Sequence, residues 1–173
     1  SPLELSSAAS DVYKRQLSRD LKNSIQLAAL HFNKEITVEI RNGDTTPYEK
    51  KKQLAKPPNI LITTPESLSL LLSNKESNNL FKDLSSIIID EWHELMGSKR
   101  GNQCELSLSW LRGNIKNLQI WAMSATIGNI EEAARAIVGI SAIKPKIIRT
   151  NIQKEIEIIS VLPEEKTTFP WSG

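Results

Sequence analysis

The sequence of 173 residues has little of several features that define whole classes of protein. Its single cysteine, Cys104, excludes an internal disulfide, and nothing indicates an oxidising compartment. No apolar run approaches the roughly 20 residues that a membrane-spanning helix needs, and no basic segment followed by an apolar one marks a secretion signal. The net charge of +2 gives no global basic field for nucleic acid, so any such contact depends on local placement. These absences favour a cytoplasmic globular domain.

What the sequence does contain is a regular alternation of strand-like and helix-like segments. Strand patterns cover residues 36–40, 59–64, 85–90, 118–123, 146–150 and 155–162. Helix patterns cover residues 17–32, 46–56, 65–73, 104–111 and 130–138, and a polar loop is expected over 74–79. Strands that alternate with helices imply a parallel sheet with right-handed crossovers, and therefore an α/β fold.

Two of the predicted helices carry clear end signals. Thr46 is expected to be an N-cap, with Pro47 at the first helical position and Glu49 placed to close a capping box. Asn129 is expected to cap the helix that Gly139 ends.

The amino-terminal segment is unusual. Ser6–Gln16 reads SSAASDVYKRQ, which resembles the translation of a transposase adapter used in sequencing libraries. Residues 1–16 are therefore predicted to be non-native, with the native sequence resuming near Leu17. The alternative is an ordinary polar helix start.

The stretch SSIIIDEWHELMGSKRG places polar chemistry directly after a buried strand. Ile87–Ile89 form a β-branched run that is typical of the centre of a parallel sheet, and Asp90 and Glu91 follow at once. In such sheets ligands bind at the carboxyl ends of the strands. One carboxylate there can hold Mg²⁺ while its neighbour orients an attacking water. The alternative is a helix start whose acids complement the helix dipole.

Other polar groups are expected at the same edge of the sheet. Ser124 and Thr126 follow an apolar strand, although turn and capping chemistry also explains them. Thr64 is the expected N-cap of a helix whose amino-terminus would suit an anion, and a capped helix alone is the alternative. Arg41 and Thr45 flank a Gly-Asp turn and are candidates for contact with a phosphate backbone.

The order of these segments along the chain indicates a protein family more specifically than any one segment does alone. The strings TPES, DEWH and SAT resemble motifs Ib, II and III of the first motor domain of superfamily 2 helicases. The longer strings RNGDT, ILITTPESLSLLL, DEWHELMGSKRG and SATIGN resemble the large helicase-related family, with the ligase-associated DEXH-box helicases of bacteria as the nearest branch. The resemblance covers Leu17 to Gly173, with LSRDL similar to the tail of motif Ia and FPWSG similar to the entry into a second motor domain.

The resemblance implies a RecA-like three-layer domain with a mainly parallel central sheet, and an ATP-dependent DNA helicase or translocase that uses ATP and Mg²⁺. It implies that Asp90 binds the Mg²⁺ on ATP, that Glu91 acts as general base towards water, and that His93 couples nucleotide state to DNA. Ser124 and Thr126 would share that coupling. The residues expected to lie towards the DNA backbone are Arg41, Thr45, Thr64, Pro65 and Glu66.

Further implications of the resemblance concern partners and aromatic residues. It implies 3′-to-5′ unwinding, a role in DNA repair and ligase-associated partner proteins, with RNA as an alternative substrate. Trp92 and Trp121 are predicted to be core aromatics and not platforms for stacked bases.

One expected motif does not occur in the sequence. No G-x-x-x-x-G-K-[ST] loop, which cradles a triphosphate, is present among the scattered glycines. The chain is therefore predicted to be a fragment that lacks the phosphate-loop strand and cannot hydrolyse ATP alone. Its predicted parts are a partial ATP-binding domain over 17–150 and an exit segment over 151–173. A non-catalytic nucleic-acid-binding module derived from a helicase is the alternative, and the acid pair favours the enzyme.

Overall fold

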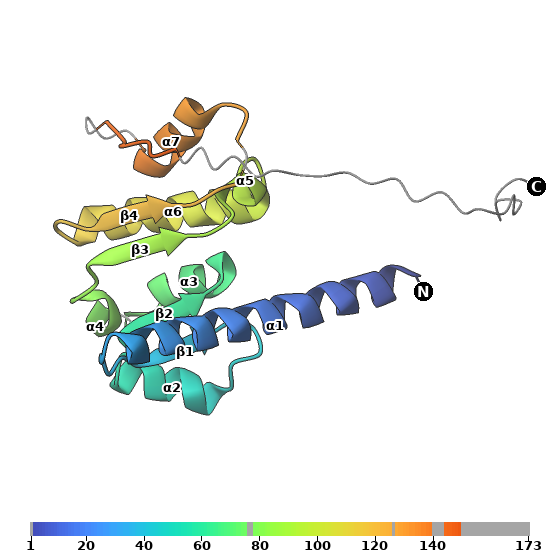
Figure 1. The fold of residues 1–173 in the computed structure, drawn as a ribbon, viewed down its shortest axis with the longest axis vertical. Coiled ribbons are helices and arrows are strands. Elements are labelled where there is room, and N and C mark those ends of the chain that lie inside the picture. The colour runs from blue at the N-terminus through green and yellow to red at the C-terminus, as the bar shows by residue number, and fades with distance from the viewer. Residues whose placement is uncertain (1, 76–77, 126, 140–143, 150–173) are drawn as a thin grey trace, which may run out of the picture.

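The computed structural model describes residues 2–75, 78–125, 127–139 and 144–149, with side chains from residue 16 onward except those of residues 78 and 79. The helices are α1 (Pro2–His31), α2 (Pro47–Ala55), α3 (Pro65–Leu72), α4 (Asn78–Phe81), α5 (Trp92–Leu95), α6 (Lys99–Asn114) and α7 (Ile130–Val138). The strands are β1 (Val38–Arg41), β2 (Ile60–Thr63), β3 (Ser86–Ile89) and β4 (Gln119–Ala122). Helical segments separate successive strands, so the predicted α/β class is confirmed (Figure 1).

The strands pair in parallel, as the alternating pattern predicted. β1 pairs with β2, which places Arg41 opposite Thr63, and β3 pairs with β4, which places Ile89 opposite Ala122. Because parallel neighbours need a crossover, α2 connects the first pair, and α5 and α6 connect the second. Within the described ranges the two pairs are separate sheets, because no ladder of hydrogen bonds joins β2 to β3. The single central sheet expected from the sequence is therefore divided into two pairs.

Helix α6 organises the hydrophobic core. Its residues Cys104, Leu108 and Leu111 follow one face at helical spacing, as predicted, and all three are buried. Cys104 and Leu108 belong to a cluster with β3, α5 and α7, whereas Leu111 belongs to a second cluster with α3 and α4. Full burial of a leucine side chain stabilises a fold by about 1.5–3 kcal/mol. Because the two clusters include residues of both strand pairs, α6 joins the two pairs through its buried face.

The predicted helix caps are confirmed. The Glu49 carboxylate accepts from the Thr46 N–H at 3.0 Å, and the Glu49 N–H donates to the Thr46 hydroxyl at 3.2 Å, which closes the capping box. Asn129 caps α7 by accepting from the Glu132 N–H at 3.2 Å, and Gly139 ends that helix at a φ of 65°. Each cap is a contact between near neighbours in sequence, which is why the local pattern was enough to predict it.

Two local predictions are corrected, and two others lie outside the described residues. Residues 144–149 contain no strand, although 146–150 was expected to be one, and Ile148 is exposed. The strand-like pattern there is not matched by a ladder of hydrogen bonds to any described strand. Helix α4 begins at Asn78, inside the predicted polar loop. The predicted strand over 155–162 and the exit segment over 151–173 lie outside the described residues.

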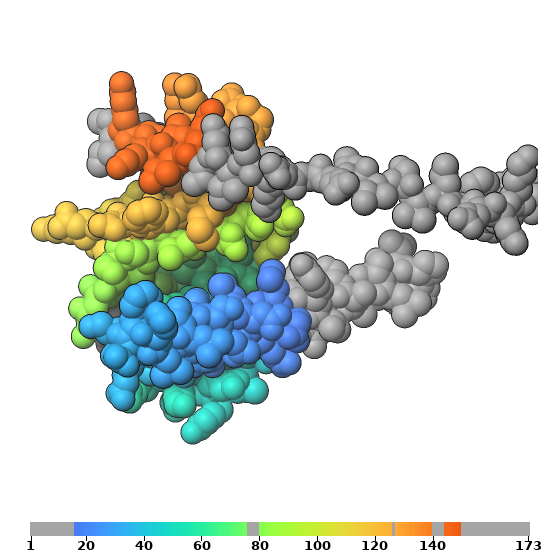
Figure 2. Space-filling view, in the orientation of Figure 1, coloured from blue at the N-terminus to red at the C-terminus, as the bar shows by residue number. Residues whose placement is uncertain are grey.

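Helix α1 lies along β1 and carries much of its apolar surface outward. Leu17, Leu21 and Leu27 are exposed, and Ala29 is buried. Figure 2 shows the described part of α1 as a blue ridge on this face of the molecule. The helix runs through the predicted boundary at Leu17 without a break, so the non-native origin of residues 1–16 stays a prediction. None of the described helices, α1 included, is long and apolar enough to cross a membrane.

The two tryptophans singled out in the sequence differ in their surroundings. Trp92 is 1% exposed, which confirms its prediction as a core residue. Trp121 is 54% exposed and lies opposite Ile88, which is 67% exposed, on the open face of β3 and β4. The core prediction for Trp121 is therefore wrong, because the described residues pack on only one face of this strand pair.

Candidate functional site

The Asp90–His93 segment is held in place by the continuation of the β3–β4 pair. The Met123 N–H donates to the Ile89 carbonyl at 2.8 Å, and the Trp92 N–H donates to the Met123 carbonyl at 3.0 Å. The buried Trp92 ring also donates its Nε1–H to the Ala133 carbonyl of α7 at 3.2 Å. These bonds fix the backbone around the acid pair, while the side chains of Asp90 and Glu91 remain exposed to solvent.

Glu91 has a backbone conformation that is uncommon for a residue with a side chain. Its φ of 49° and ψ of 46° lie in the left-handed region, which costs of order 1–3 kcal/mol in a non-glycine residue. The Glu91 N–H donates to Asp90 Oδ1 at 3.0 Å. Such strain persists only where surrounding contacts hold it, and Trp92 supplies those contacts on the next residue.

His93 contacts both the acid pair and the segment after β4. Its Nδ1 lies 2.9 Å from the Ser124 hydroxyl and 3.3 Å from a carboxylate oxygen of Glu91. The predicted neighbourhood of Asp90–His93 and Ser124 at one sheet edge is therefore present in the structure. Thr126 lies outside the described residues.

The acid pair suits a Mg²⁺ ion that is carried by a nucleotide. Asp90 Oδ2 has no hydrogen-bond partner in the part of the chain that the structure describes. Among the described residues no group of three or more His, Cys, Asp or Glu side chains is arranged to hold a metal ion. Mg²⁺ is commonly bound through one or two carboxylates together with phosphate oxygens and water, so a single exposed aspartate is chemically compatible with such an ion.

Arg41 and Thr45 lie at the carboxyl end of β1 and take part in the local fold. Arg41 Nη1 donates to the Lys50 carbonyl at 3.1 Å and to Gln53 Oε1 at 3.3 Å, and partial burial lowers the pKa of the guanidinium. The Thr45 hydroxyl accepts from the Asn42 N–H at 2.9 Å, which closes the turn after the strand. Both candidate phosphate contacts therefore also hold the β1–α2 connection.

Thr64, Pro65 and Glu66 form the start of α3 as predicted. Thr64 is the N-cap, its hydroxyl accepting from the Ser67 N–H at 3.4 Å, and Pro65 is the first helical residue. Since Thr63 pairs with Arg41, this turn lies at the same sheet edge as the end of β1. Partial burial acts to raise the pKa of the Glu66 carboxyl, but hydrogen bonds from its own N–H, from Arg100 and from Thr64 bring the pKa below its ordinary value.

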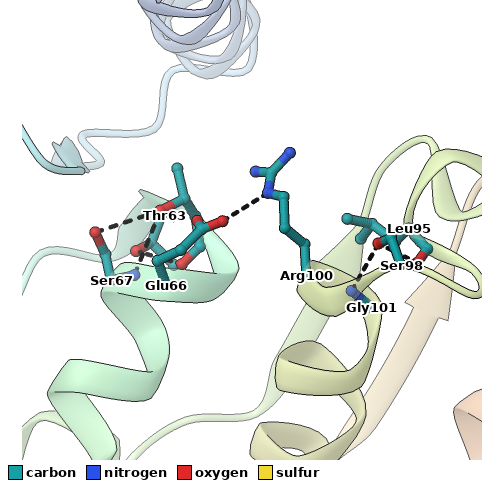
Figure 3. Close-up of polar contacts among 8 residues, drawn as sticks. Thr63, Glu66, Ser67, Leu95, Ser98, Arg100 and Gly101 are labelled. Atoms are coloured by element: carbon teal, nitrogen blue, oxygen red, sulfur yellow. Dashed lines mark hydrogen bonds and ion pairs between the residues drawn. The ribbon is translucent and has the colours of Figure 1, made fainter.

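Arg100 also contacts this turn, although no pattern in the sequence predicts a role for it. Its Nε donates to Glu66 Oε1 at 2.6 Å in a charge-assisted hydrogen bond (Figure 3). The string SKRG belongs to the segment that resembles the helicase family, but no local pattern marks Arg100, because its partner lies 34 residues earlier in the chain. The pairing depends on the packing of α3 against α6.

Comparison with known proteins covers all of the described candidate residues. A family model described as DEAD/DEAH box helicase matches residues 14–133. The chain is 39% identical over 131 residues to the ATP-dependent helicase Lhr-Core of Saccharolobus solfataricus, which covers 75% of this chain and 15% of that protein. It is 37% identical over 118 residues to the Lhr helicase/uracil glycosylase of Escherichia coli, which covers 66% of this chain and 8% of that protein.

A solved structure supports the same relationship. The Mycobacterium smegmatis helicase Lhr bound to ssDNA and AMP-PNP matches 68% of this chain and 16% of its own, at 35% identity and a TM-score of 0.58. The chain therefore spans about 15% or less of the length of these two curated relatives. The match concerns this segment of the relatives and not their whole length.

Proposed function

Since the chain belongs to the DEAD/DEAH box helicase family and is related to Lhr helicases, we propose that it is part of the first motor domain of an ATP-dependent DNA helicase or translocase. The observation that carries this proposal is the contact between His93 and Ser124 at the edge where Asp90 and Glu91 face solvent. A helix start alone has no need of a bond that joins the acid segment to the end of the next strand.

Within this proposal Asp90 and Glu91 have different roles in ATP hydrolysis. Asp90 holds the Mg²⁺ of the nucleotide through its free carboxylate oxygen, and the ion supplies charge neutralisation to the phosphates when it is bound. Glu91 orients a water molecule and accepts its proton as the water oxygen bonds to the γ-phosphorus of ATP and the bond to the bridging oxygen breaks, so that ADP leaves. The fixed backbone at Trp92 keeps the two carboxylates turned outward from the core.

The coupling and DNA roles are assigned to the neighbouring polar groups. His93 and Ser124, with Thr126, relay the nucleotide state to the DNA-binding edge. We assign Arg41, Thr45 and the Thr64–Glu66 turn to the DNA backbone. This assignment is supported by their common position at the carboxyl ends of β1 and β2, and by the single-stranded DNA in the related Lhr structure.

The direction of unwinding and the biological setting are part of the same proposal. We propose movement in the 3′-to-5′ direction, a role in DNA repair and ligase-associated partner proteins. An ATP analogue is bound in the related Lhr structure, which supports ATP as the cofactor. The 173-residue chain is proposed to be inactive alone, because it contains no phosphate loop to hold a triphosphate beside Asp90.

The test is to measure ATP hydrolysis, with and without single-stranded DNA, for the complete helicase that contains this segment and for the segment alone. The complete helicase should hydrolyse ATP faster when DNA is present, and the segment should not hydrolyse it. Duplexes with 3′ or 5′ single-stranded tails then report the direction of unwinding. DNA binding by the complete protein without ATP hydrolysis would favour the non-catalytic binding module.

A further inference from the structure

The Glu66–Arg100 ion pair joins the first turn of α3 to the first turn of α6. Figure 3 shows the Arg100 side chain extending from α6 towards Glu66, with a dashed line from its Nε to the Glu66 carboxylate. Both side chains are about half exposed, at 45% and 46%. The same two helices also pack through Leu71 and Leu111 in the hydrophobic core, so α3 is attached to α6 at two places.

The first turn of α6 is in turn fixed to α5. The Ser98 hydroxyl donates to the Leu95 carbonyl at 2.6 Å and accepts from the Gly101 N–H at 3.1 Å. Gly101 packs so closely that a Cβ atom there would lie 2.0 Å from the Leu95 carbonyl oxygen. Arg100, which precedes Gly101, therefore extends from a turn that is packed directly against the end of α5.

Helix α5 begins directly after the candidate acid pair. It starts at Trp92, its four residues include His93, and the Met96 N–H closes it by donating to the Trp92 carbonyl at 3.2 Å. A continuous series of short contacts thus runs from the acid pair through α5 and the first turn of α6 to Arg100 and Glu66. This series of contacts differs from the His93–Ser124 contact, which connects α5 to the segment after β4.

We propose that Arg100 is a positioning residue that ties the Thr64–Glu66 turn to the α5–α6 junction and so transmits changes at the acid pair to the DNA-binding edge. The inference rests on the proposed function, since it assumes that the acid pair acts on ATP and that the Thr64–Glu66 turn lies towards DNA. Arg100 acts through Glu66 and is not itself assigned a contact with ATP or DNA.

The charges at the two helix starts support this role. Glu66 would repel a nearby phosphate if its carboxylate were unpaired, and Arg100 neutralises it at 2.6 Å. Exposed ion pairs contribute little to the stability of a fold. If Arg100 had a structural role only, its replacement should therefore change stability and activity very little. A large functional effect would therefore indicate positioning.

The experiment uses the complete helicase with Arg100→Ala, Arg100→Lys, Glu66→Gln, the double variant Arg100→Ala/Glu66→Gln and the charge-exchanged pair Arg100→Glu/Glu66→Arg. ATP hydrolysis without DNA, its maximal stimulation by single-stranded DNA, and DNA affinity at several salt concentrations are measured for each. Lys99→Ala is the matched control, because it removes the same charge from the same turn of α6 at an exposed residue.

Arg100→Ala should leave hydrolysis without DNA unchanged and reduce maximal DNA stimulation about tenfold, within the usual range of coupling between two sites. Arg100→Lys and the charge-exchanged pair should restore part of the stimulation, because each provides an opposite charge at the same contact. The double variant Arg100→Ala/Glu66→Gln should lose no more DNA stimulation than Arg100→Ala does, as expected for two residues that act through one interaction. DNA should stimulate ATP hydrolysis by Lys99→Ala as strongly as it does for the unmodified protein.

Two results would overturn the proposal while leaving the proposed function intact. One is DNA-stimulated hydrolysis in which Arg100→Ala behaves like Lys99→Ala. The other is a loss of DNA affinity with a shallower salt dependence and full maximal stimulation, which would make Arg100 a direct phosphate contact. Absence of DNA-stimulated hydrolysis in the unmodified complete helicase would instead overturn both the proposed function and this inference.

Discussion

His93 and Ser124, 31 residues apart in the sequence, are joined by a hydrogen bond of 2.9 Å between the imidazole Nδ1 and the hydroxyl. The bond spans from α5 to the segment after β4, and the same nitrogen faces the Glu91 carboxylate at 3.3 Å. One imidazole therefore contacts the candidate base and the end of the neighbouring strand. In the proposed motor this imidazole connects the acid pair directly to the segment that resembles motif III.

His93→Ala and Ser124→Ala should each reduce DNA-stimulated ATP hydrolysis by the complete helicase, and the double variant should lose little more than the worse of the two. Residues in direct contact show such non-additive effects, whereas distant residues have additive ones. Phosphate release with saturating single-stranded DNA is the measurement. Ser109→Ala, which removes an exposed hydroxyl from α6, is the control and should have no effect. Additive losses would remove this bond from the coupling route.

Glu91→Gln in the complete helicase should reduce ATP hydrolysis by roughly 10²–10⁴-fold, the typical contribution of a general base. Nucleotide affinity should be retained, because the amide has the same shape and Asp90 is unaltered. Asp90→Asn is the comparison, and it should weaken Mg²⁺-dependent nucleotide binding as well as turnover. Phosphate release and nucleotide affinity are measured for both variants. A Glu91→Gln protein that hydrolyses ATP at the original rate would leave the acid pair as a helix start only.

Arg41→Ala should weaken DNA binding by the complete helicase to a similar extent for different sequences, and should reduce the salt dependence by about one released counterion. Thr64→Ala should weaken binding without changing the salt dependence, since it carries no charge. Fluorescence anisotropy over a range of salt concentrations measures both quantities. Lys51→Ala, an exposed cation on α2, is the control. Equal salt dependence for Arg41→Ala and the unmodified protein would indicate that Arg41 serves only the β1–α2 connection.

Gly101→Ala should destabilise the 173-residue chain by at least about 1–3 kcal/mol, because the added Cβ would meet the Leu95 carbonyl oxygen at 2.0 Å and the helix start must shift. Gly113→Ala is the matched control in the same helix, where a Cβ meets nothing within 4 Å. That change should stabilise the chain by about 0.5–1 kcal/mol through helix propensity. Thermal melting of both variants is the measurement. Equal melting temperatures would contradict the close packing of α6 on α5.

The Glu66–Arg100 contact should contribute to stability in a pH-dependent way. The pKa of Glu66 is lowered in the folded state, so over the titration window the unfolded chain binds more protons than the folded chain. The contribution is therefore present above the unfolded pKa of about 4.3 and is lost as pH falls through the lower folded pKa. Because both side chains are about half exposed, it should amount to less than about 1 kcal/mol.

The check is thermal melting of the unmodified chain and of Glu66→Gln between pH 3 and pH 7. The difference in melting temperature should shrink as the pH falls, since protonated Glu66 and glutamine are both uncharged. Arg100→Ala should reduce the pH dependence, because it removes one of the hydrogen bonds that lower this pKa. A difference that grows at low pH would contradict the lowered pKa.

Local patterns in the sequence were enough to predict most of the elements and their ends. The capping box of Thr46 and Glu49 and the caps at Asn129 and Gly139 involve groups only a few residues apart, so the sequence specifies them directly. The β-branched run Ile87–Ile89 predicted a strand with polar residues at its end, and β3 confirms the strand. The expected burial on both faces is wrong for Ile88, which is 67% exposed.

The tertiary structure alone decided which of these groups meet. Arg100 and Glu66 are 34 residues apart, and no local pattern pairs them until α3 packs against α6. Gly101 is required only because α6 starts on the Leu95 carbonyl, and Trp121 is exposed only because the described residues leave one face of β3 and β4 uncovered. Most of the elements, their caps and the acid pair could be predicted from the order of residues, since they depend on near neighbours in the chain. Only the packing decided which contacts form between distant segments, because those contacts depend on where the chain places its helices in space.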